Sequence, residues 1–314
     1  GMDKIMYYDM NKYINRIILA FTVVSFALVA SSCGGSNRAE DTTKNPWGWN
    51  KGDEDKKDED TGSESKTYYP KEKGSFRIMS YNIGCFGKYI TSVTDNVKMV
   101  ADMIKEIEAD VVTLNELDSI NTRHNVNEVA LLAEGVGGWK WHFGRAMAYR
   151  NGAYGNGCIV PKETKIIDKY TVTLPKLSGA EQRSIAVVET EDYVIGAAHL
   201  DHTSEPTRLS QIAVVNAWAR ERYEKCSKPV FFCGDMNADP DSETVKTLKN
   251  TWDMLSSTEY SFPSRGAKSC IDYIFHYKNS AAVKLVGAHT MTRFYKGDVT
   301  MASDHLPIYV DVQF

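Results

Sequence analysis

The sequence has few features of zinc-finger proteins, of proteins that coat nucleic acid, or of membrane-spanning proteins. Its six cysteines form no Cys-x-x-Cys pair and no Cys/His cluster at zinc spacing, which argues against a structural zinc site. Only Cys226 and Cys233 lie close enough in sequence to be worth testing as a disulfide. From residue 74 onward acidic residues slightly outnumber basic ones, whereas proteins that coat nucleic acid by charge usually carry a basic surplus. No internal repeat occurs, so a solenoid or propeller is not expected.

The first 33 residues have the pattern of a secretory leader. An uncharged run from Ile17 to Ala30 follows Lys12 and Arg16; it is short for a membrane span, which needs about 20 apolar residues, but it suits a signal core. Cys33 follows two serines and precedes two glycines, which is similar to a bacterial lipoprotein cleavage site. Because Ala30 replaces the usual Leu, a plain secreted protein and a short anchor helix stay open. We expect residues 1–33 to be a signal peptide and the protein to reside in the cell envelope, lipid-anchored or secreted.

Residues 34–73 differ in composition from the rest of the chain. They are polar and charged, with KGDEDKKDED at 51–60, which predicts a disordered, solvated tether. Residues 74–314 read as one catalytic domain of alternating strands and helices. Helical periodicity is present at 95–108, 127–135, 205–224 and 242–248. Strand-like runs are present at 77–83, 110–114, 139–143, 157–160, 166–172, 184–189, 193–199, 230–233, 270–276, 284–288 and 306–312.

Polar side chains recur at or just beyond the ends of the apolar, β-branched runs. The segments are SYNI (80–83), LNELD (114–118), AHLDH (198–202), GDMNA (234–238), IDYIF (271–275) and SDHLPI (303–308). At such positions a strand rim can gather carboxylates, amides and imidazoles around one cleft. Oxygen ligands of this kind suit Mg²⁺, Mn²⁺ or Ca²⁺, and neighbouring imidazoles suit proton transfer or charge stabilisation on a phosphate.

The order of these motifs closely resembles the endonuclease/exonuclease/phosphatase superfamily, from about residue 76 to residue 314. GDMN followed by SDH near the C-terminus is the specific part of the resemblance. Two departures are visible, since Asn115 stands where many members have Gln and Ala198 stands where Thr often precedes the His. The resemblance implies an α/β fold: a pseudo-symmetric, four-layered α/β/β/α sandwich of two mixed sheets flanked by helices.

The resemblance also implies a metal site. Glu116 follows a buried run with one residue between, where an unpartnered carboxylate would be costly, and it matches the metal-binding Glu of the family. Asn82 and Asp304 match residues beside the metal. The alternative for Glu116 is a turn cap or an ion pair with Arg123.

The GDMN and SDH segments supply the expected catalytic groups. Asp235 matches the residue that orients or deprotonates the attacking water, and Asn237 matches a donor to the phosphate, although this segment alone would read as an Asx-rich turn. The resemblance pairs His305 with Asp272, which would fix the tautomer and direction of the ring. Whether His305 acts as a base or as a cationic clamp stays open.

The remaining candidates lie around the phosphate. His199 matches the residue that contacts the scissile phosphate or helps the leaving group, and Asp201 is a candidate to orient it. His202 is expected to be a loop residue. Arg183 and Asn156 match substrate-side residues of the family, an Arg near the phosphate and a glycine-asparagine turn near the site.

These assignments predict in-line hydrolysis of a phosphomonoester or phosphodiester by water, assisted by one divalent ion, Mg²⁺ or alternatively Mn²⁺ or Ca²⁺. A small molecule or lipid head group is the favoured substrate. A surface endo- or exonuclease is the alternative, and a non-catalytic binding lipoprotein is disfavoured because the Asp, His and Glu set is complete. We expect a monomer that touches the membrane only through its N-terminal lipid, with nucleic acid as a partner only if basic residues gather on one face.

Overall fold

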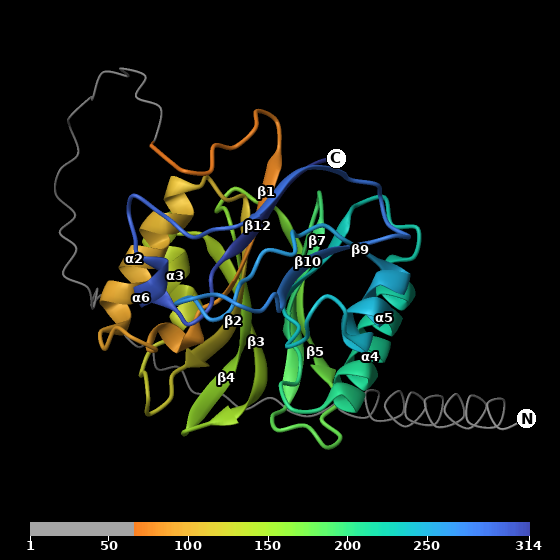
Figure 1. The fold of residues 1–314 in the computed structure, drawn as a ribbon, viewed down its shortest axis with the longest axis horizontal. Coiled ribbons are helices and arrows are strands. Elements are labelled where there is room, and N and C mark those ends of the chain that lie inside the picture. The colour runs from red at the N-terminus through yellow and green to blue at the C-terminus, as the bar shows by residue number, and fades with distance from the viewer. Residues whose placement is uncertain (1–65) are drawn as a thin grey trace, which may run out of the picture. The chain divides into compact units, whose positions relative to one another are not determined.

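The computed structural model describes residues 66–314, which fold into two six-stranded sheets packed face to face (Figure 1). The first sheet has the order β11-β12-β1-β2-β4-β3 and consists of β1 (Phe76–Asn82), β2 (Val111–Ser119), β3 (Lys140–Tyr149), β4 (Gly152–Val160), β11 (Lys284–Thr290) and β12 (Ile308–Gln313). The second has the order β5-β6-β7-β8-β10-β9 and consists of β5 (Ile166–Leu174), β6 (Arg183–Thr190), β7 (Val194–His199), β8 (Val230–Asp235), β9 (Trp252–Met254) and β10 (Asp272–Tyr277).

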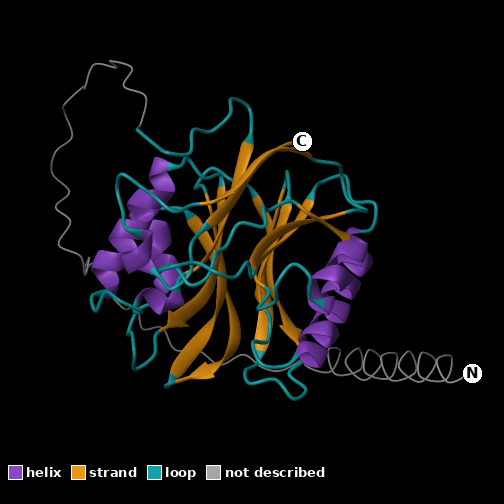
Figure 2. Cartoon of the chain, in the orientation of Figure 1, coloured by secondary structure: helices purple, strands orange, loops and turns teal. Residues whose placement is uncertain are grey.

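Helices cover the outer faces of both sheets (Figure 2). Those beside the first sheet are α2 (Val93–Glu106), α3 (Glu128–Gly137) and the short α6 (Val299–Ala302), while α4 (Glu205–Tyr223) and α5 (Glu243–Thr251) cover the second; a 3-10 turn, η1 (Gly84–Phe86), follows β1. The helix starts at Ser92, Asn127, Ser204 and Ser242 each have a capping side chain that accepts a backbone N–H bond. None of the helices between residues 66 and 314 has the length and apolar character needed to cross a bilayer.

The two halves of the sandwich repeat one topology. In the first, β1 and β2 are parallel neighbours joined through α2; in the second, β7 and β8 are parallel neighbours joined through α4. Both pairs are flanked by antiparallel strands, so each sheet is mixed. One apolar layer fills the space between the sheets and two further layers lie under the helices. The predicted four-layered sandwich is therefore confirmed.

Strand register assembles the polar rim. His199, the last residue of β7, pairs with Asp235, the last residue of β8, and Asp235 pairs in turn with Asp272 at the start of β10. In the first sheet Asn82 at the end of β1 pairs with Asn115 in β2. Strand register thus aligns three sequence-distant motifs in the second sheet and two in the first.

The sequence-based boundaries of β2, β3 and β4 are too short. The expected strand 110–114 continues to Ser119 through a β-bulge between Leu114 and Leu117, and Glu116 lies in that bulge with a φ of 56°. Glu116 is therefore inside the strand and not beyond its end. The hairpin β3–β4 extends past the apolar runs because its outer part carries polar, small and glycine residues. Strand β9 and helices η1 and α6 have no apolar run of their own and were not expected.

The folded unit begins before residue 74. Tyr69 packs against the core under α2, and its carbonyl accepts a 2.7 Å bond from Arg77, whose guanidinium is paired with Asp311. Tyr68 stacks on Tyr295. Residues 66–73 thus lie against the domain, a correction to the tether boundary at residue 73, because two aromatic residues anchor an otherwise charged segment. The predicted signal peptide, Cys33 and the rest of the tether lie outside the described residues.

Candidate active site

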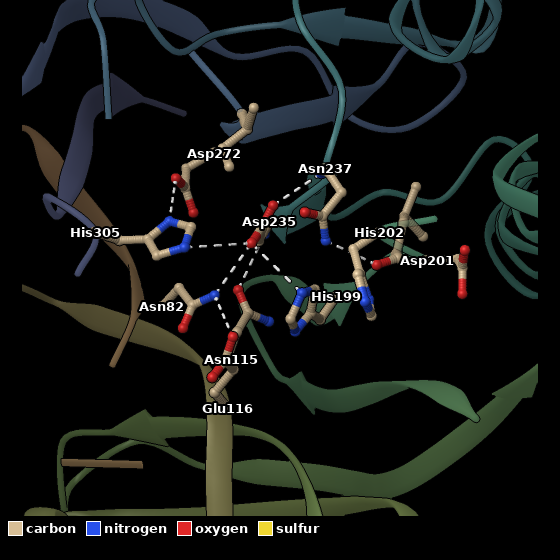
Figure 3. A network of polar contacts seen from close by, with 12 residues as sticks. Asn82, Asn115, Glu116, His199, Asp201, His202, Asp235, Asn237, Asp272 and His305 are labelled. Carbon is tan, nitrogen blue, oxygen red and sulfur yellow. Dashed lines mark hydrogen bonds and ion pairs between the residues drawn. The ribbon is translucent and has the colours of Figure 1, made fainter. Parts of the chain in front are cut away.

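The carboxylate of Asp235 is the centre of the polar rim (Figure 3). Its Oδ2 lies 3.1 Å from Asn82 Nδ2, 3.4 Å from His199 Nε2 and 3.6 Å from His305 Nε2. Its Oδ1 accepts a 2.8 Å bond from the backbone N–H of Asn237. Asp235 is only 1% exposed, so its carboxylate is almost completely shielded from solvent.

Burial and the negative charge of Asp272 raise the pKa of Asp235 to about 7, although His305 and the bonds from Asn237 and Asn82 act in the opposite direction. A carboxylate with a pKa near neutrality is suited to accept a proton from water at the pH where it works.

His305 and Asp272 are in direct contact, as the order of SDH and IDY led us to expect. His305 Nδ1 lies 2.9 Å from Asp272 Oδ2, and the same oxygen accepts a 2.7 Å bond from Ser261. Burial alone would lower the pKa of His305, but the charge and hydrogen bond of Asp272, with help from Asp235, raise it to about 10. His305 is therefore an imidazolium at neutral pH, with Nε2–H directed at Asp235.

His199 has the opposite electrostatic environment. Burial, then the positive charges of Arg183 and His305, lower its pKa well below the ordinary value. Arg183 Nη1 lies 3.1 Å from His199 Nδ1, and a guanidinium can only donate, so Nδ1 accepts and the proton is on Nε2. The two imidazoles around Asp235 are thus one cation and one neutral ring, a difference that sequence alone did not provide.

Glu116 and Asp304 form the other end of the rim. Glu116 Oε1 accepts a 3.2 Å bond from Asn82, and Lys88 Nζ lies 2.8 Å from Asp304 Oδ2 and 3.9 Å from Glu116 Oε2. A single ammonium group therefore lies close to both carboxylates. Two carboxylates with further oxygen donors nearby fit Mg²⁺, Mn²⁺ or Ca²⁺.

Asn82 lies between two carboxylates of the rim. Its Nδ2 donates to both Glu116 and Asp235, while its Oδ1 accepts a 3.2 Å bond from the N–H of Gly84. Asn82 therefore holds the carboxylates of Glu116 and Asp235 together. The alternative pairing of Glu116 with Arg123 is absent, because Arg123 binds Asp118 through both oxygens, at 2.6 and 2.8 Å.

We expect Lys88→Met to bind Mg²⁺ about twofold to fivefold more tightly. Lys88 competes with the ion for Glu116 and Asp304, and a partly exposed ion pair is worth up to about 1 kcal/mol. Titration calorimetry on the metal-free protein measures this, with Lys98→Met on the exposed face of α2 as the matched control. Unchanged or weaker affinity would show that Lys88 does not occupy the ion's position.

A chain of amides supports the rim from behind. Asn115 Oδ1 accepts from the N–H of Asp235 at 3.0 Å, and its Nδ2 donates to Ala198 and to Asn156 at 2.8 and 3.0 Å. Asn156 in turn donates to the carbonyl of Ser184 at 2.9 Å. Both ends of the Asn156 amide are thus engaged by the protein, which makes it a positioning residue for Asn115 and not a group that faces substrate. Asn115 was noted in the sequence only as a departure from Gln.

The loop after β7 corrects one expectation and places two others. Asp201 does not orient His199; it accepts from the N–H groups of Thr203 and Ser204 and caps the turn before α4. His202 lies on this loop, 3.2 Å from Arg183 Nη2, so Arg183 contacts both histidines. The Asn237 side chain, expected to face the phosphate, donates to the carbonyl of Leu200 at 3.0 Å.

The five cysteines between residues 66 and 314 form no disulfide. Cys226 and Cys233 are both free, and Cys233 is buried in β8 among apolar side chains.

The sandwich and its carboxylate–imidazole rim define a phosphoesterase class of fold. The Endonuclease/Exonuclease/phosphatase family model matches residues 79–305, and the chain belongs to this family. Members are generally hydrolases of phosphoester bonds and use divalent metals. No curated protein sequence matches the chain significantly.

Solved structures share the fold at low sequence identity. An endonuclease/exonuclease/phosphatase from Bacteroides vulgatus is 17% identical with a TM-score of 0.64, and 76% of this chain and 99% of that one are covered. A mannosyl-6-phosphatase from Bacteroides thetaiotaomicron is 15% identical with a TM-score of 0.62, and 76% and 100% are covered. The human Nocturnin catalytic domain, with bound sulfate, is 18% identical with a TM-score of 0.59, and 77% and 94% are covered.

Proposed function

We propose that this protein is a divalent-metal-dependent hydrolase of a small phosphoester, acting by direct attack of water. The observation that carries the proposal is the convergence on Asp235 Oδ2 of a cationic His305 and a neutral His199, beside a pair of carboxylates that can share one cation. A proton acceptor, phosphate donors and an ion site within one rim are the parts that phosphoester hydrolysis needs.

In this reaction Asp235 accepts the proton of the attacking water. His305 and His199 present N–H groups to the phosphate oxygens, and Asp272 and Arg183 keep the two rings in their protonation states. Mg²⁺, when held by Glu116 and Asp304, supplies charge stabilisation for the phosphoryl and leaving oxygens. Water attacks the phosphorus directly, so no covalent intermediate is needed.

Two observations support a small substrate. The chain has a formal net charge of −4, which gives little of the non-specific affinity that nucleic acid binding draws from phosphate neutralisation. A mannosyl-6-phosphatase shares the fold over most of this chain. We further propose that the enzyme works in the cell envelope as a monomer, anchored through a lipid on Cys33.

The test is a substrate panel on purified protein dialysed against chelator. We expect hydrolysis of p-nitrophenyl phosphate or bis-p-nitrophenyl phosphate only after a divalent ion is restored, with Mg²⁺, Mn²⁺ and Ca²⁺ compared. Plasmid DNA, RNA and sphingomyelin in the same panel separate a nuclease or a lipid-head-group hydrolase from the proposed activity. Full activity in excess chelator would contradict the metal requirement, and no activity on any member would favour the non-catalytic alternative.

A further inference from the structure

A polar cleft of about 420 Å³ opens beside the metal-binding carboxylates. Its walls come from η1 and the following loop and from the β3–β4 hairpin, and it includes Glu116 and Lys88 of the rim. The volume lies in the range of small-molecule sites. A group bound in the cleft would therefore lie beside the Glu116 end of the rim.

Tyr154 presents an unused donor to this cleft. It is 8% exposed, lies in the cleft wall, and its hydroxyl has no hydrogen-bond partner among residues 66–314. Burial, followed by the charge of Glu116, raises the pKa of Tyr154 well above its ordinary value, so the hydroxyl stays protonated. A hydroxyl that faces the cleft without a protein partner can donate to a ligand oxygen.

The charges around the cleft are already compensated. Arg123 is bound by both oxygens of Asp118, Lys88 by Asp304, and Glu181 lies 3.2 Å from Arg183. A polyanionic ligand would therefore find these cationic side chains already paired with carboxylates. A neutral ligand with several hydroxyl groups can instead exchange hydrogen bonds with these side chains.

Arginine side chains lie over the aromatic ring of Tyr149 in the cleft wall. The ring of Tyr149 lies 4.9 Å from the guanidinium carbon of Arg123 and 5.4 Å from that of Arg150. Recognition of single-stranded nucleic acid relies on open aromatic faces on which bases stack. This cleft has polar edges in place of such a platform.

The two histidines beside Asp235 are buried. His199 and His305 are both 4% exposed, with Nε2 atoms 3.4 and 3.6 Å from Asp235 Oδ2. A substrate with one bulky substituent fits this arrangement, with its phosphate innermost and its alcohol portion in the cleft.

We propose that the cleft binds the alcohol portion of the substrate, and that the substrate is a phosphomonoester of a compact polyol, such as a monosaccharide or a cyclitol. Tyr154 is the specificity-determining residue, donating to a hydroxyl of the bound polyol. The inference rests on the proposed function and names the substrate class for the same site.

The test compares kcat/KM for glucose 6-phosphate and myo-inositol 1-phosphate with that for p-nitrophenyl phosphate, in Mg²⁺. In Tyr154→Phe we expect the ratio of polyol to p-nitrophenyl substrate to fall about threefold to tenfold, as for the loss of one hydrogen bond. Tyr193→Phe, a buried tyrosine outside the cleft that packs on Phe76, should keep the parent ratio. Met147→Trp, at a half-buried position of the cleft wall, should lower the ratio by filling the space, and it serves if Tyr154→Phe fails to fold.

The outcomes separate this inference from the proposed function. If the parent hydrolyses p-nitrophenyl phosphate with Mg²⁺ but neither cleft substitution changes the ratio, the cleft assignment is overturned and the proposed function stands. Preference of the parent for an oligonucleotide over both polyol phosphates would overturn the substrate class. If the parent hydrolyses nothing in metal, both fail.

Discussion

Asp235→Asn should lower kcat for phosphoester hydrolysis by about 100- to 10,000-fold, the range typical of general acid–base assistance. The substitution keeps the size of the side chain and an oxygen that can accept from the N–H of Asn237. It removes the charge that Asn82, His199 and His305 surround. The loss should fall on kcat, because proton transfer from water matters in the transition state and not in substrate binding.

Steady-state kinetics at saturating Mg²⁺ measure the effect, with circular dichroism and thermal melting to show that the fold is kept. Asp192→Asn, on an exposed turn before β7, is the matched control and should behave as the parent. A variant of Asp235 within threefold of the parent would remove this carboxylate from the catalytic role.

The strand-end part of the site was predictable because short-range patterns determine it. Asn82, His199 and Asp235 each follow an apolar run that the sequence predicts as a strand, and each is the last residue of its strand. Once such strands lie in parallel or antiparallel register, their ends meet at one edge. The contact of His305 with Asp272 was available only through the family resemblance, since the residues are far apart in the sequence.

The remaining parts depend on contacts that no local pattern encodes. The bulge at Glu116 interrupts β2 without a glycine or proline to mark it. Lys88 stands in a loop of ordinary composition, and its ammonium reaches Asp304 only because η1 turns the chain back over the rim. Tyr154 reads as one aromatic residue of a strand, and its free hydroxyl emerges only when the cleft walls come together.

The electrostatic difference between the two histidines also could not be predicted from the sequence. It comes from Asp272 on one side and Arg183 on the other, both nearly fully buried. In AHLDH and SDH the two imidazoles are chemically equivalent. Packing makes one a cation and leaves the other neutral.

The contact between His305 and Asp272 makes a second strong prediction, about coupling. Asp272 Oδ2 accepts from His305 Nδ1 at 2.9 Å, and this bond both orients the ring and raises its pKa to about 10. Without Asp272 the buried imidazole would lose its proton and its direction. Asp272 also raises the pKa of Asp235 by its charge, but its direct contact within the rim is with His305, so the two residues should behave as one unit.

Asp272→Ala and His305→Ala should each lower kcat strongly, by about 100-fold or more, and the double variant should be hardly worse than His305→Ala alone. The matched control is the Asp253–His276 pair, a 3.8 Å contact between neighbouring strands of the second sheet outside the rim, whose substitution should leave kcat near the parent value. Kinetics at saturating Mg²⁺ on all six variants provide the two cycles. If the effects of Asp272→Ala and His305→Ala multiply independently, Asp272 must contact the reacting groups by another route, and a direct role for this carboxylate at the metal would replace the dyad.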